Sequence, residues 1–140
     1  MRGRPASAGP VEGGPGRVLV AVYAVFALAA GARATVQLAT RFAEAPLAYV
    51  LSALAAAVYV VAAVALARDG RGGRRTAWVA CSVELAGVLV VGTLSVVDPA
   101  AFPDETVWSD FGRGYLYIPL VLPVLGLLWL RRRSREARTA

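Results

Sequence analysis

The chain has 140 residues, of which 58% are hydrophobic and 17% charged, and its formal net charge is +6. This balance is too apolar and too poor in charge for an ordinary soluble domain, and the length suits one domain. All 15 basic residues are Arg, and they flank apolar blocks instead of following one face. That placement favours a membrane protein over one that binds nucleic acid.

The chain opens with residues 1–16, which are rich in Gly and Pro and predict a disordered cytoplasmic tail. An apolar block begins after Arg17, and its helical pattern continues to Phe42, which predicts a first membrane span near residues 18–40. A basic start, an apolar core and small residues at its end are also typical of a secretory signal peptide. Cleavage of the first helix therefore stays an alternative.

Two longer blocks follow, with predicted spans near residues 46–67 and 77–97. The first carries no charge, and the second carries only Glu84. A helix of about 21 residues covers ~31 Å, close to the hydrocarbon thickness of a bilayer. The turn between the blocks, 68–75, is basic. The loop after them, 98–114, is acidic. We expect this loop to be irregular and to lie at the water interface, with an aromatic belt formed by Trp108, Phe111, Tyr115 and Tyr117.

The last apolar block covers residues 115–130, or ~24 Å of helix, and predicts a fourth span near 114–130 that begins early, tilts little or thins the bilayer. Pro119 and Pro123 each remove a backbone donor, which predicts a kink; freed carbonyl groups that line a polar pathway are the alternative. A basic tail, 131–140, follows.

Orientation follows from the Arg residues. With the N-terminus inside, 12 of the 15 lie on the cytoplasmic side. The predicted fold class is thus all-α: a four-helix bundle (residues 17–130) integral to the cell (plasma) membrane, with both termini cytoplasmic.

Four stretches (42–53, 83–95, 102–115 and 119–132) read FAEAPLAYVLSA, VELAGVLVVGTLS, FPDETVWSDFGRGY and PLVLPVLGLLWLRR. In these stretches the chain resembles a group of small four-helix integral membrane proteins of actinobacteria that have no assigned activity. The Arg-rich composition without Lys suits a GC-rich genome of that kind. The resemblance implies a topology and an origin, and it transfers no catalytic residue.

Glu84 is the only acidic residue well inside a predicted span. It lies ~14 Å from the basic boundary at Arg75, and Tyr59 has about the same depth in its own helix. We expect Glu84 to face the bundle interior in its neutral form and to bond with Tyr59, with Tyr23 as the less favoured partner. Such a carboxyl group is either a structural pin or a functional group that exchanges protons.

Three further polar residues belong to the outer side: Arg33, Gln37 and Asp98. Arg33, Gln37 and Arg41 follow at four-residue spacing and therefore share one side of the first helix. We predict that Arg33 reaches the outer interface or Asp98 instead of Glu84, because Glu84 sits ~10 Å deeper.

No enzyme or cofactor motif is present. The chain has no His, and its one Cys, Cys81, permits no internal disulfide and none of the usual zinc or haem ligand sets. The acids of the loop 98–114 match no calcium-binding pattern. The favoured hypothesis is a non-enzymatic accessory or assembly module in the bilayer, as a homo-oligomer or in a larger complex. The alternative is a small oligomeric transporter or channel that uses Glu84.

Overall fold

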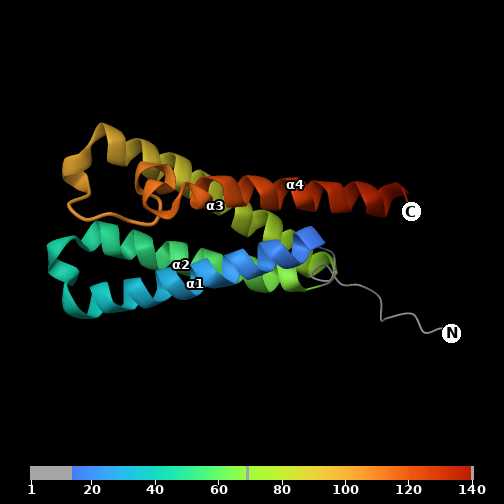
Figure 1. Ribbon diagram of the computed structural model, residues 1–140, viewed down its shortest axis with the longest axis horizontal. Helices are drawn as coiled ribbons and strands as arrows, with labels where there is room; N and C mark the ends of the chain where they lie inside the picture. The colour runs from blue at the N-terminus through green and yellow to red at the C-terminus, as the bar shows by residue number, and fades with distance from the viewer. Residues whose placement is uncertain (1–13, 69, 140) are drawn as a thin grey trace.

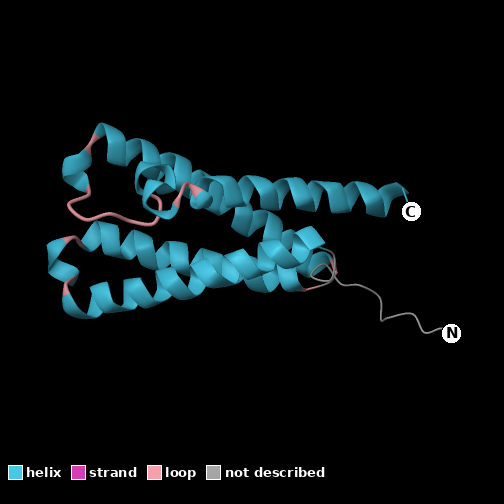
Figure 2. Cartoon of the chain, in the orientation of Figure 1, coloured by secondary structure: helices cyan, strands magenta, loops and turns pink. Residues whose placement is uncertain are grey.

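The computed structural model describes residues 14–68 and 70–139, without the side chains of residues 137–139. These residues form helices and connections and contain no strand (Figure 2), which confirms the predicted all-α class for the described chain. The four α-helices are α1 (Gly14–Thr40), α2 (Pro46–Ala67), α3 (Arg71–Val97) and α4 (Ile118–Thr139). Three short 3₁₀ helices lie in the connections: η1 (Phe42–Glu44), η2 (Pro99–Ala101) and η3 (Ser109–Tyr115).

Both ends of the chain differ from their predicted boundaries. Helix α1 begins at Gly14, inside the predicted tail 1–16, whose residues 1–13 lie outside the described part. Helix α4 continues into the predicted basic tail as far as Thr139.

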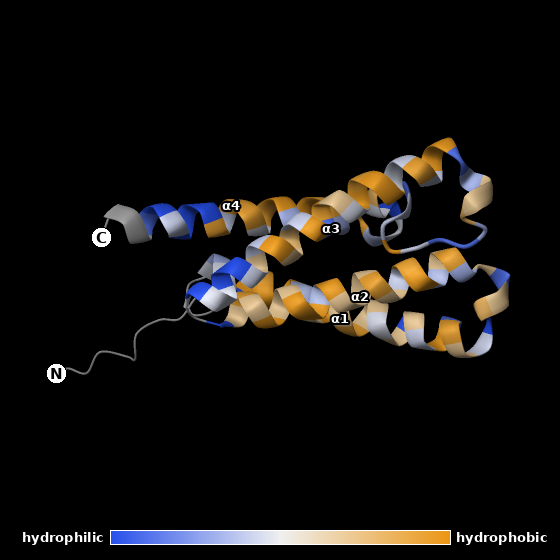
Figure 3. Cartoon of the chain, turned by 180° about the vertical axis from the view of Figure 1, so that it is seen from behind, coloured by the Kyte–Doolittle hydropathy of each residue, from blue (hydrophilic) through white to orange (hydrophobic). Residues whose placement is uncertain are grey.

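The helices run back and forth along the long axis of the molecule (Figure 1). Helices α1 and α2 lie side by side and antiparallel, and α3 crosses from them towards α4. The start of α1, the α2–α3 turn and the end of α4 share one end of the molecule, which we call the basic end. The opposite end, with η1 and η2, we call the acidic end. Figure 3 shows hydrophobic helix middles between hydrophilic ends, as a membrane protein requires.

Three helices, α1, α2 and α3, are long and apolar enough to cross a membrane. The number rises to four only if η3 and α4, which meet at an angle of 99°, form one broken span. The segment of the predicted fourth span, 114–130, is therefore not one continuous helix, and its break is far sharper than a proline kink. Leu116 and Tyr117 both adopt a left-handed backbone conformation (φ 59° and 60°), and α4 begins after them.

Proline explains where this break falls. In a continuous helix the ring of Pro119 would clash with the carbonyl group of Tyr115, so the chain turns one residue after Tyr115. From Ile118 the apolar part of α4 reaches only to Leu130, which is ~20 Å of helix. Alone it is too short for the ~30 Å hydrocarbon core.

The loop between α3 and α4 occupies the space that a full-length fourth helix would fill. Trp108 is 2% exposed, and its ring lies so close to Gly87 that a Cβ atom there would approach the ring to 2.6 Å. The ring of Phe111 lies against Gly92 in the same way, at 2.5 Å. The predicted interfacial belt is therefore wrong for Trp108. The loop enters the bundle because two glycines of α3 leave room for aromatic rings.

Candidate functional site

Glu84 lies in the interior of the bundle, as its position in the sequence predicted. It is 0% exposed and sits on the buried face of α3, between Cys81 and Val88. These positions recur every three or four residues, which is the period of one helix face. Apolar side chains on the other faces of α3, such as Val83 and Val90, point outward, where lipid can cover them.

The two tyrosines that the sequence singled out both lie beside Glu84. Tyr23 comes from α1 and Tyr59 from α2, both are 0% exposed, and their ring centroids are 6.2 Å apart. The Glu84 carboxyl group is near enough to interact electrostatically with both hydroxyl groups and with the thiol of Cys81. Three helices thus bring four polar groups together, which we call the Glu84 cluster: Tyr23, Tyr59, Cys81 and Glu84.

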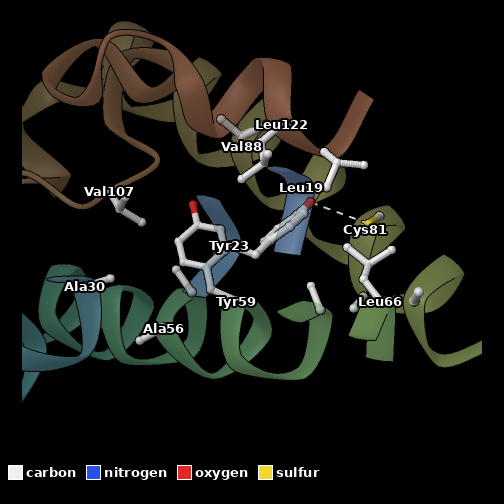
Figure 4. Packing of buried hydrophobic residues seen from close by; sticks show 14 of the residues in the cluster. Leu19, Tyr23, Ala30, Ala56, Tyr59, Leu66, Cys81, Val88, Val107 and Leu122 are labelled. Atoms are coloured by element: carbon white, nitrogen blue, oxygen red, sulfur yellow. Dashed lines mark hydrogen bonds between the residues drawn. The ribbon is translucent and has the colours of Figure 1, made fainter. Parts of the chain in front are cut away.

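The expected hydrogen bond between Glu84 and Tyr59 is absent from the described structure. The Tyr59 hydroxyl oxygen instead accepts a hydrogen bond of 3.2 Å from Nε1 of Trp108. The Tyr23 hydroxyl lies near both Glu84 and Cys81, and only its 3.4 Å contact with the Cys81 sulfur has hydrogen-bond geometry (Figure 4). Among the described residues, neither carboxyl oxygen of Glu84 has a hydrogen-bond partner.

This arrangement has an energetic consequence. A buried polar group without a partner costs about 1–3 kcal/mol, and an ionised carboxylate costs more. The neutral carboxyl group expected from the sequence is the less costly form of Glu84 in this place.

Helix α4 closes the cluster. A Cβ atom at Gly126 would lie 2.9 Å from the Cys81 sulfur and 3.6 Å from the Tyr23 hydroxyl oxygen, so glycine permits the close approach of α4. Pro123, one turn earlier, is fully buried as well. The sequence reasoning did not assign Gly126 or Cys81 to the site. Cys81 was detectable, because it precedes Glu84 by three residues and so shares its helix face.

The predicted outer-side residues do not form one site. An Arg33 guanidinium nitrogen donates a hydrogen bond of 2.9 Å to the Tyr115 hydroxyl, so Arg33 is oriented neither to Asp98 nor to Glu84. Asp98 is exposed at the end of α3, where its N–H group bonds to the Leu94 carbonyl oxygen.

Gln37 has surroundings unlike those of its expected neighbours. It is 2% exposed, whereas Arg33 and Arg41 are exposed, so the three do not share one environment. Both polar atoms of the Gln37 side-chain amide lack a hydrogen-bond partner within the described chain.

A second polar contact joins α2 to the loop at the acidic end. The Tyr49 hydroxyl donates a hydrogen bond of 2.8 Å to one carboxylate oxygen of Asp104, and the Glu105 N–H group donates one of 2.8 Å to the other. The Tyr49 hydrogen bond is the main reason that the pKa of Asp104 lies below its usual value.

Within the described ranges, no group of three or more His, Cys, Asp or Glu side chains is placed to hold a metal ion. Comparison of the chain with models of protein families, with curated proteins and with solved structures finds no match.

Proposed function

We propose that this protein is a non-enzymatic integral membrane module that acts as an accessory or assembly component, alone as a homo-oligomer or within a larger membrane complex. The closed Glu84 cluster carries this proposal. Its groups come from α1, α2 and α3, and α4 packs on them at Gly126. A polar centre enclosed in this way fixes the packing of helices, whereas an enzyme site needs access for a substrate.

The proposed setting is the plasma membrane with both termini cytoplasmic. The charge asymmetry between the basic end and the acidic end supports this orientation. Cysteines introduced at Gly72 and Glu105, both exposed, test it in a Cys81→Ala background. Labelling with an impermeant reagent should reach the two positions from opposite sides of the membrane. Labelling of both from the same side would refute it. Relationship to actinobacterial membrane proteins stays a prediction from the sequence.

A small oligomeric transporter or channel is the second candidate, and one observation favours it. Both Glu84 carboxyl oxygens lack a hydrogen-bond partner in the described chain, and an intramembrane carboxyl group without a structural partner is a candidate for proton or cation exchange.

Reconstituted vesicles separate the two candidates. If the Glu84 cluster is structural, wild type should carry no proton flux. Glu84→Gln should then leave the free energy of unfolding nearly unchanged, and Glu84→Met should not lower it, because the buried carboxyl group has no hydrogen-bond partner in the described chain to lose.

A proton flux in wild type that Glu84→Gln abolishes would overturn the assembly proposal in favour of transport. The outward-facing Ser82→Ala variant on the same helix is the matched control, because Ser82 is exposed and lies outside the Glu84 cluster.

A further inference from the structure

A small cavity at the basic end is lined by arginines from different helices. Its volume is about 50 Å³, and its charged lining side chains are Arg68 at the end of α2, Arg74 on α3 and Arg133 on α4. This volume holds several water-sized groups, which matches a phosphate group in size. Trp129 of α4 completes one wall.

The described side chains that line this cavity include three positive charges. No acidic side chain lines the cavity in the described part of the chain. Arg74 and Arg133 are half-buried, and the Arg133 guanidinium lies 5.6 Å from the centroid of the Trp129 ring, a cation–π distance. Arginine forks match the geometry of phosphate oxygens, so three of them around one small cavity favour an anionic phosphate ester.

An apolar groove continues from this cavity along the outer side of α2 and α3. The groove has a volume of about 630 Å³ and shares Ala65 and Arg68 with the cavity. A third hollow of about 210 Å³ shares Val61 and Thr76 with the groove and extends to Val83. The path therefore leads from the arginines towards the hydrocarbon depth of the membrane.

We propose that the basic end binds one anionic phospholipid, with its phosphate group between Arg68, Arg74 and Arg133 and one acyl chain in the groove between α2 and α3. Charge complementarity favours an anionic headgroup. A zwitterionic headgroup carries a positive charge beside its phosphate, and this charge would be repelled by the arginines of the cavity. The apolar continuation selects a lipid over a free phosphate ester, which would leave the groove unused. The headgroup would lie where the apolar blocks end, at the level of the membrane surface.

Native mass spectrometry of the full chain tests the headgroup site. The protein in detergent is offered phosphatidylglycerol and phosphatidylcholine with identical acyl chains. Wild type should retain phosphatidylglycerol preferentially. Arg74→Gln should weaken that binding about fivefold, whereas the neighbouring Arg75→Gln, which removes the same charge outside the cavity, should change it less than about twofold.

Arg68→Gln gives a second test if Arg74→Gln does not fold, because the Arg68 side chain is exposed and also lines the cavity. Equal retention of the two lipids by wild type, or equal effects of Arg74→Gln and Arg75→Gln, would overturn the proposal.

The acyl-chain groove is tested separately. Val61→Trp fills the groove and should weaken phosphatidylglycerol binding, whereas Val50→Trp, at a similarly exposed position near the other end of α2, should not (Val61 is 45% and Val50 49% exposed). Glycerol 3-phosphate at equal concentration should not displace the lipid. Displacement, or an equal effect of both tryptophans, would point to a free phosphate ester and refute the lipid site.

Discussion

The two halves of the molecule differ in how their helices are built and packed. The α1–α2 half consists of two continuous helices joined by a short connection, and small buried residues such as Ala30, Ala48 and Ala55 allow the two to pack closely. The α3–α4 half consists of one continuous helix and one broken helix, and a loop fills the gap. Continuous apolar blocks thus form unbroken helices. In the last quarter of the chain, Pro and Gly residues allow a broken helix and a loop that packs inside the bundle.

The Glu84 cluster lies where these two halves meet. Tyr23 and Tyr59 come from the first half, and Glu84, Cys81 and the covering glycine, Gly126, come from the second. Substitutions in each half test how strongly the stability of the α3–α4 half depends on close packing.

The largest effect should follow from Gly87→Val. A Cβ atom at Gly87 would lie 2.6 Å from the Trp108 ring, so the loop must leave its place. We expect a loss of about 3 kcal/mol in the free energy of unfolding, measured in mixed micelles. In the α1–α2 half, Gly31→Val is the matched control, because a Cβ atom at Gly31 meets nothing within 4 Å. Equal effects of the two substitutions would contradict the inserted loop.

Gly126→Val should have the next largest effect, about 2 kcal/mol, because the new side chain meets the Cys81 sulfur at 2.9 Å. Cys81→Ala removes this obstacle and should restore part of the stability in the double variant. Strictly additive effects, determined by the same unfolding measurement, would show that α4 does not close on Cys81.

Tyr59→Phe should cost less, about 0.6 kcal/mol, because it removes only the acceptor of the Trp108 hydrogen bond. The loss should vanish in a Trp108→Phe background, where no indole donor remains, and unfolding free energies of the four proteins measure this coupling. Tyr117→Phe, at an exposed position in the chain break, serves as control. An undiminished loss in the Trp108→Phe background would assign the Tyr59 hydroxyl to another partner, Glu84 above all.

The smallest effect concerns pH at the acidic end. Because the Tyr49 hydrogen bond lowers the pKa of Asp104, the stabilisation is complete above the unfolded-state value of about 3.9 and is lost as pH falls through the lower folded-state value. Tyr49→Phe should therefore reduce stability by a few tenths of a kcal/mol at pH 6 and by less at pH 2. The free energies of unfolding of wild type and Tyr49→Phe at the two pH values measure this loss. A larger loss at pH 2 than at pH 6 would reverse the sign and contradict the assignment.

Much of the candidate site could be read from the sequence. The depths of Tyr23, Tyr59 and Glu84 along their helices follow from counting residues, and these three do lie together. Their hydrogen bonds could not be read, because the bonding partner of Tyr59 is Trp108, a loop residue 49 positions away. An interfacial Trp and a buried Trp have the same local sequence signal, and only the space above Gly87 distinguishes them.

The sequence by itself determined the helical class, the three helices that are long and apolar enough to cross a membrane, and the separation of a basic from an acidic end, because these depend on local composition and on the length of apolar blocks. The tertiary structure decided how the last quarter of the chain folds. The residues from Asp110 to Tyr117 include five with a left-handed backbone conformation, which contacts with α3 must hold in place. Such a break depends on contacts between residues separated in the chain, such as Gly87 with Trp108 and Gly92 with Phe111, which form only in the folded bundle.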